Sequence, residues 1–205
     1  MVEPKLPRRP DADRGQVGIE TLIIFIAMIL VAAVAAGVLI NTAGFLQNKA
    51  SATSHESQEQ VSNQVIVVTA TGQINDAQQI NYTNLTVMQS PGAKEIDLQA
   101  ATIEFIGPDG TDTLTYAGGD GYANNASFGV SAIKDSDSST PVLNSKEDRM
   151  TIHINLTAND GVLQPLDEGS EATLRIVTQS GSQYTYIANV PESLSSKEPG
   201  EAVEL

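Results

Sequence analysis

The stretch from Thr21 to Leu46 contains no charged residue, and it limits what this chain can fold into. Between Val17 and Leu46, 23 of the 30 residues are hydrophobic and none is proline. Leu, Ile, Met and Ala favour helix, and about 20 apolar residues in a helix span a bilayer. Apolar residues occupy every side of this segment, so every side must be covered by lipid or by protein. The sequence therefore predicts a long helix that is not stable alone in water.

The remainder of the chain is polar and acidic. The 205 residues include 11 Lys and Arg against 25 Asp and Glu, a net charge of −14. Nucleic-acid binding needs clustered basic residues, so we expect no nucleic-acid partner. The chain has no cysteine and two histidines, His55 and His153, which excludes disulfides, thiolate sites and a His-rich metal site. We expect no metal and no cofactor.

Motifs of catalysis are missing from the sequence. It contains neither a Gly-rich phosphate loop nor a Gly-x-Ser-x-Gly turn, and the histidines lack metal-ligand spacing. Two acidic runs, Asp109–Asp112 and Asp135–Ser139, are more simply explained as turns than as cation sites. We therefore expect that the chain is not an enzyme.

From Val65 onward, short runs rich in Val, Ile, Thr and Tyr alternate with clusters of turn residues, which is typical of strands. Ser180 and Gly181 stand between the last two runs and predict a tight hairpin. This number of short strands predicts an immunoglobulin-like β-sandwich over residues 63–205, so the expected class is α+β, a long N-terminal hydrophobic helix followed by an all-β sandwich. The runs are residues 65–70, 82–89, 95–106, 111–117, 127–132, 150–157, 172–179 and 183–189.

The junction before the apolar segment, from Arg14 to Leu22, resembles the processing site of type III signal peptides. These peptides are used by type IV pilins and by archaeal flagellins (archaellins). The resemblance implies that a membrane peptidase cuts between Gly15 and Gln16, which removes a leader of residues 1–15 and leaves the helix of residues 16–62 on the mature chain. A glycine offers little steric hindrance to an active-site cleft.

The run from Phe25 to Gln47 is very similar to that of archaellins of halophilic archaea. Looser similarity continues at Ile106–Gly110, Thr113–Tyr116 and Val190–Leu194. The resemblance implies a structural subunit of the extracellular archaeal flagellum (archaellum) filament, inserted in the membrane before assembly and used for swimming. It also implies the partners: other copies of the chain or other archaellins, a prepilin-like leader peptidase, and the archaellum assembly platform and motor.

Several positions in the helix are expected to take part in filament assembly. Glu20 is the fifth residue after the proposed cut. In the pilins that the chain resembles, a Glu there neutralises the terminal ammonium of a neighbouring subunit, whereas many halophilic archaellins have Gly. Small residues let helix backbones approach closely, although they are also common in membrane helices generally. These residues are Ala32, Ala33, Ala36, Gly37 and Gly44.

The outer part contains four Asn-x-Ser/Thr sequons, which mark possible N-glycosylation on an exported surface. The resemblance to archaellins implies that such sites are modified outside the cell. They begin at Asn81, Asn84, Asn125 and Asn155.

Two other functions stay open. An adhesive type IV pilin subunit is favoured by Glu20 and disfavoured by the downstream similarity. A membrane-anchored β-sandwich binding protein would keep its leader uncut. After cleavage the chain would carry 7 basic and 22 acidic residues, a balance that suits molar salt.

Overall fold

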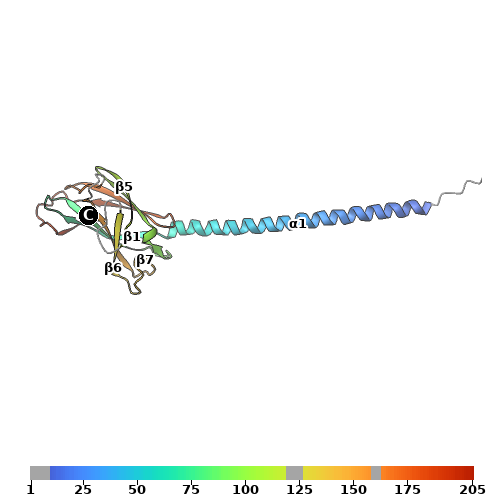
Figure 1. Ribbon diagram of the computed structural model, residues 1–205, viewed down its shortest axis with the longest axis horizontal. Helices are drawn as coiled ribbons and strands as arrows, with labels where there is room; N and C mark the ends of the chain where they lie inside the picture. Colours follow the sequence, from blue (N-terminus) through green and yellow to red (C-terminus); the bar gives the residue numbers. More distant parts are fainter. Residues whose placement is uncertain (1–9, 119–126, 158–162) are drawn as a thin grey trace, which may run out of the picture. The chain divides into compact units, whose positions relative to one another are not determined.

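The chain forms one long helix and one β domain (Figure 1). The fold is that of a computed structural model, which describes residues 10–118, 127–157 and 163–205, with side chains from residue 17 onward. The chain divides into two compact units, Met1–Ser54 and His55–Leu205. The last two turns of the helix therefore belong to the same unit as the strands.

Helix α1 (Pro10–Ser62) is continuous over 53 residues, about 80 Å at 1.5 Å per residue. In the uncleaved chain it begins at Pro10, and a proline is well tolerated at the first helical position. The start at Gln16 expected for the mature helix stays a prediction. Every side chain from Val17 to Gln58 is exposed. The helix is long and apolar enough to cross a membrane, and none of its apolar part is buried within the chain.

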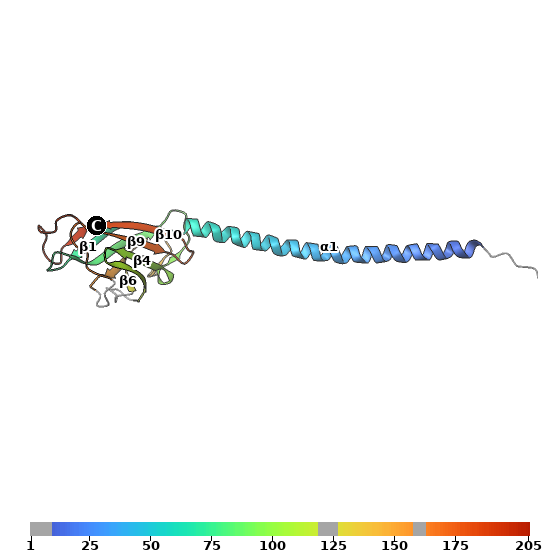
Figure 2. The ribbon, with the colours of Figure 1, turned by 90° about the horizontal axis from the view of Figure 1, so that it is seen from above.

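The β domain is built on one nine-stranded sheet with the order β10-β9-β4-β5-β6-β8-β2-β1-β11. All neighbours are antiparallel except β5 and β6. Strands β10, β9 and β4 lie side by side (Figure 2). The strands are β1 (Val65–Ile74), β2 (Ile80–Gln89), β4 (Thr102–Gly107), β5 (Gly110–Tyr116), β6 (Ser127–Lys134), β8 (Arg149–Asn155), β9 (Glu171–Val177), β10 (Gln183–Asn189) and β11 (Ala202–Glu204), with the small pair β3 (Ile96–Asp97) and β7 (Val142–Leu143) apart.

The α+β class is confirmed, with a long apolar helix followed by a β domain. The two layers expected of a sandwich are two halves of one sheet, β10-β9-β4-β5 and β6-β8-β2-β1-β11. They join through a parallel contact of two residue pairs, Thr115 with Ser127 and Tyr116 with Phe128. The sheet curls so that β1 lies near β10. The two halves can therefore share one core.

The core of the β domain comes from the alternation of side chains along the strands. In β4, Ile103 and Phe105 are buried, and in β9 Leu174 and Ile176 are buried, while the residues between them face outward. Residues from both halves of the sheet meet in this one cluster. The β domain thus completes a core of its own without using the apolar part of α1.

A polar joint fixes the end of α1 to the β domain. Asn63, which is 5% exposed, follows the last helical residue. Its Oδ1 accepts the backbone N–H of Lys94 at 2.9 Å, and its carbonyl accepts the hydroxyl of Thr178 at 3.2 Å. Gln64 continues the joint by donating from Nε2 to the carbonyl of Gln183 at 3.2 Å. The chain therefore leaves the helix at a defined point of the domain.

An ion pair one turn earlier supports this joint. The Lys94 ammonium lies 2.6 Å from Glu59 Oε1, and this hydrogen bond together with the positive charge holds the pKa of Glu59 below its ordinary value. Both side chains are substantially exposed, so the pair adds little stability and less in high salt.

Substituting Asn63→Ala should lower the free energy of unfolding of the β domain by about 1–3 kcal/mol, because the Lys94 N–H loses its acceptor. The measurement is chemical denaturation of the detergent-solubilised full chain, followed by circular dichroism. The control is Asn189→Ala, an exposed asparagine on β10, which should change stability by less than about 0.5 kcal/mol. Equal free energies of unfolding of the two variants would contradict a stabilising role of the joint.

Substituting Lys94→Gln should raise the pKa of Glu59 toward its ordinary value. Since the folded-state pKa is depressed, the ion pair stabilises the fold above the ordinary carboxyl pKa, and its contribution is lost as the pH falls through the depressed value. Carboxyl-carbon NMR titration of the full chain measures this shift. The matched control is Lys134→Gln, which should raise the pKa of Glu147 and leave that of Glu59 unchanged.

Candidate functional site

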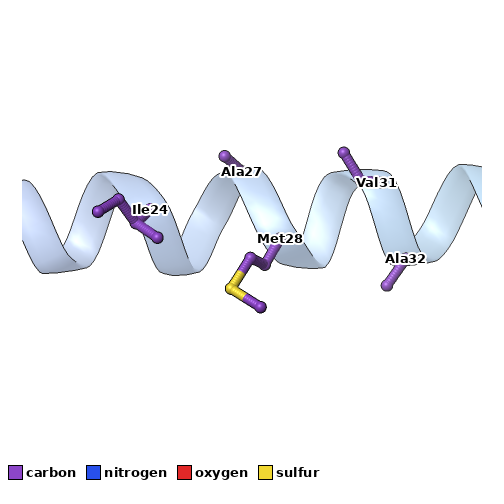
Figure 3. Close-up of a pocket in the computed structure, with 5 residues that line it drawn as sticks. All are labelled: Ile24, Ala27, Met28, Val31 and Ala32. Atoms are coloured by element: carbon purple, nitrogen blue, oxygen red, sulfur yellow. The ribbon is translucent and has the colours of Figure 1, made fainter.

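The apolar part of α1 carries a stripe of larger side chains with hollows between them. Ile24, Ala27, Met28, Val31 and Ala32 line a hollow of about 430 Å³. Figure 3 shows Ala27 beside Val31 on one side of this hollow and Met28 beside Ala32 on the other. The two alanines create the hollow because their side chains end at Cβ.

The same face continues toward the β domain. Val38, Asn41, Thr42 and Phe45 line a second hollow of about 380 Å³. Val38 and Phe45 follow Ile24 and Val31 of the first hollow at intervals of seven residues. Residues seven apart lie on nearly the same side of a helix. The stripe therefore runs over four positions, Ile24, Val31, Val38 and Phe45.

The small residues singled out in the sequence are all exposed on α1. Ala32 lines the first hollow, whereas Ala33, Ala36, Gly37 and Gly44 line neither. A Cβ added at Gly37 or Gly44 would meet no atom within 4 Å, so nothing within the chain requires glycine there. Small residues at such positions allow the backbone of another helix to approach closely.

The proposed processing site lies inside the helix. The backbone of Arg14, Gly15 and Gln16 is part of α1, and their side chains are outside the described part of the chain. Glu20 is exposed and lies one helical turn after Gln16. The Thr21 hydroxyl donates to the carbonyls of Val17 and Gly18, both at 3.0 Å, which satisfies this polar group within the helix.

The first sequon is poorly accessible in the folded chain. Thr83, whose hydroxyl completes the Asn81 sequon, is 1% exposed, and its Oγ1 is buried without a partner. Asn81 Oδ1 is buried without a partner as well. Asn125 lies outside the described residues.

The second sequon belongs to a short network across β2, β8 and β6. His153 Nδ1 lies 2.8 Å from Asn84 Oδ1, and its Nε2 lies 2.7 Å from Ser131 Oγ. Since the amide oxygen is an acceptor, Nδ1 carries the proton and Nε2 of the neutral ring accepts from the hydroxyl. His153 lies half-buried on β8, between β2 and β6.

The fourth sequon, at Asn155, stands at the end of β8. Asn155 Oδ1 accepts from the backbone N–H of Thr157 at 2.9 Å and from its hydroxyl at 2.5 Å. Thr157 is exposed and Asn155 is half-buried. The amide nitrogen of Asn155 takes no part in these two contacts. Of the described sequons, this one presents its hydroxyl residue most openly.

The run at Asp135 forms a loop after β6, whereas the run at Asp109 comprises a turn residue and the start of β5. Asp135 Oδ2 accepts from the backbone N–H of Thr140 at 2.9 Å and from its hydroxyl at 2.7 Å, and the hydroxyl bond is the main reason why the pKa of Asp135 is well below its usual range. Asp112 accepts from the N–H of Thr113 at 2.8 Å. Within the described residues, no group of three or more His, Asp or Glu side chains is arranged to hold a metal ion.

Comparison with known proteins identifies the family. The model of the family described as archaeal-type flagellin matches residues 15–187 of the chain. The chain belongs to the archaeal-type flagellin family. The similarity to archaellins of halophilic archaea that the helix sequence indicated is thereby confirmed.

Named relatives cover nearly the whole of this flagellin. Flagellin B1 of Halobacterium salinarum is 49% identical over 185 residues, which are 90% of this chain and 93% of that protein. Flagellin A2 of Haloferax volcanii is 37% identical over 214 residues, with 95% and 97% coverage. The similarity therefore includes both the helix and the β domain.

Two solved structures share the fold. The archaeal flagellum of Methanospirillum hungatei strain JF1 matches with a TM-score of 0.66 at 19% identity, over 86% of this chain and 94% of that one. The crystal structure of flagellin FlaB1 from Methanocaldococcus jannaschii matches with a TM-score of 0.58 at 19% identity, over 68% and 94%. Archaeal flagellins thus have this arrangement of a helix and a β domain.

The sequence of this flagellin does not predict the polar joint at Asn63. The partners of Asn63 are Lys94 and Thr178, which are distant in sequence, and no local pattern identifies them.

Proposed function

We propose that this chain is the repeating structural subunit of an archaeal flagellar filament and that it is not itself an enzyme. One observation carries the proposal: the apolar side chains of α1 between Val17 and Leu46 are all exposed, while the β domain has a complete core of its own. Such a surface needs partners of the same kind along its whole length, and membership of the flagellin family indicates that these partners are other copies or other flagellins.

In the proposed sequence of events, the apolar segment is first held in the membrane, where lipid covers it. A prepilin-like leader peptidase removes residues 1–15, and the assembly platform transfers the helix into the growing filament. There the stripe of Ile24, Val31, Val38 and Phe45 packs against neighbouring helices, and the hollows between these residues receive side chains of other copies. The β domains lie outside, and the archaellum motor turns the filament.

A second function, an adhesive type IV pilin subunit, is favoured by Glu20. After cleavage this carboxylate would stand one helical turn from the new terminal ammonium at Gln16, and in a filament it would neutralise the ammonium of a neighbouring copy. A carboxylate in an apolar core is costly unless it is paired.

The filament assignment is tested by deleting the gene and scoring swimming in soft agar, surface attachment, and sheared surface filaments by electron microscopy with peptide identification. We expect loss of swimming, recovery with the wild-type gene, and peptides of this chain in the filaments. If the deletion strain swims normally but no longer attaches to surfaces, the result would instead support an adhesive type IV pilin subunit.

The stripe predicts that Ala32→Leu disturbs assembly. The added atoms fill a hollow that we assign to a neighbour, and overpacking costs about 1–3 kcal/mol, or roughly ten- to a hundredfold in association. Sedimentation of sheared filaments measures the loss. Ala52→Leu is the matched control, since it makes the same change on an exposed position beyond the apolar segment. Equal filament yield from both variants would count against the stripe.

Leader removal predicts a mature N-terminus at Gln16, measured by mass spectrometry of filament subunits. Gly15→Val should leave the precursor uncut and in the membrane, because a β-branched side chain at the scissile bond hinders access. An intact leader on filament subunits would contradict this step and would favour a membrane-anchored binding protein.

The sequon geometry predicts that Asn155 carries a glycan and Asn81 does not, since Thr157 is exposed and Thr83 is buried. Glycopeptide mass spectrometry of sheared filaments makes the comparison. A glycan on Asn81 would show that sugar is attached before β2 folds.

A further inference from the structure

The half of the sheet formed by β10, β9, β4 and β5 has an unusual outer surface. Its strand register places twelve outward side chains in a grid of three rows and four strands, which we name the neutral face. Six of the twelve are threonines and three are aliphatic. The rows are Thr115, Thr102, Val177 and Gln183; Thr113, Glu104, Arg175 and Thr185; and Thr111, Ile106, Thr173 and Ile187.

The neutral face carries no net charge, although the chain as a whole carries −14. Among its twelve described positions, the charged side chains are Glu104 and Arg175, and they pair with each other at 2.6 Å in the middle row. Glu171 borders the face. Acidic side chains lie in turns elsewhere on the domain, for example Asp135, Asp137 and Asp167.

The composition of this face suits burial against protein. The buried centre of an interface is depleted of charged residues, and threonine loses less side-chain entropy on burial than Lys, Glu or Gln. Ile187 is 49% exposed and adds apolar area at the edge strand. Because Glu104 and Arg175 already pair within the chain, neither would be buried without a partner.

The three sequons within the described residues lie on the other half of the sheet. Asn81 and Asn84 are on β2 and Asn155 is on β8, whereas the sequences of β10, β9, β4 and β5 contain no sequon. Glycans on β2 or β8 would therefore leave the neutral face uncovered. The two halves of the sheet thus differ in what can approach them.

We propose that the neutral face docks the β domain of a second copy of this chain within the filament. The inference rests on the proposed function, since packed helices hold many copies side by side. Identical acidic domains repel one another wherever their turns meet, and this repulsion is smallest where one domain presents a surface without net charge. The face has no basic cluster that would favour an anionic lipid surface or nucleic acid.

The neutral face is large enough for a contact between β domains that the packed helices already hold together, but too small to hold two subunits together alone. Strands are about 4.8 Å apart and every second residue adds about 7 Å, so twelve side chains cover roughly 400 Å². This is about half of the 800 Å² per partner found in stable complexes, so subunits released from the filament should not associate through this face alone.

Cysteine labelling tests the docking, because the full chain has no cysteine of its own. Thr185→Cys introduces a thiol on the neutral face, and Thr69→Cys introduces one on β1 in the other half; both threonines are exposed. The rate of labelling with a maleimide-linked polyethylene glycol is compared between intact filaments and detergent-dissociated subunits. We expect labelling of Thr185→Cys to be about tenfold slower in filaments, since it then requires local opening, and that of Thr69→Cys to change much less.

The docking is overturned if labelling slows equally at both positions in intact filaments. It is also overturned if labelling of Thr185→Cys does not slow in intact filaments. Either result leaves the proposed function standing. Absence of the chain from any filament overturns both. A benzophenone maleimide on the Thr185→Cys thiol then identifies the neighbour. Cross-linked dimers joined within residues 63–205 of the other copy support the docking, whereas products with another protein, with the helix, or no product overturn it.

A charge variant gives an independent measurement. Ile187→Lys places a charge on the neutral face, and Ile133→Lys makes the same change on β6 in the other half, where Ile133 is 61% exposed. Both change the net charge equally. We expect a lower filament melting temperature for Ile187→Lys alone, with unchanged thermal unfolding of dissociated subunits. Equal melting temperatures of the two variant filaments would overturn the inference.

Discussion

The exposed apolar surface of α1 is the constraint on which the rest of the molecule depends. From Val17 to Leu46 every side chain is exposed, and no described part of the chain covers them. Lipid can cover the segment as a single helix, and other helices can cover it as a bundle, because both surroundings are apolar. The proposed roles of this segment as a membrane anchor and as a filament core therefore require no refolding.

The β domain is compatible with this role because its core is independent of the apolar helix. Residues of both halves of the sheet bury one another, so the domain has the same core whether α1 lies in lipid or against other helices. The joint of Asn63 with Lys94 and Thr178 ties the last turns of α1 to the strands within one unit. In the proposed filament, these hydrogen bonds in defined directions would transmit force that a flexible linker would absorb.

The sequence predicted the elements well and their long-range arrangement less well. Composition alone indicated the helix, and seven of the eight runs became single strands because alternation is a local pattern. The run 95–106 is divided among β3, the 3-10 helix Leu98–Ala100 and β4, since Asp97 caps that turn by accepting from the Gln99 N–H. The parallel contact of β5 with β6 and the rows of the neutral face depend on register between distant strands, which no single run contains. The proposed cleavage, assembly and glycan residues came from motifs and the family resemblance. The fold adds the exposure of those whose side chains it describes.

The division of the chain at Ser54 and His55 places a boundary inside a continuous helix. Residues 55–62 share their contacts with the β domain, among them Glu59 with Lys94. A soluble fragment that starts at residue 55 would keep the joint intact, whereas one that starts at residue 64 would lose Asn63 and leave the Lys94 N–H without its acceptor. The part of the helix that shares contacts with the β domain therefore begins two turns before the helix ends.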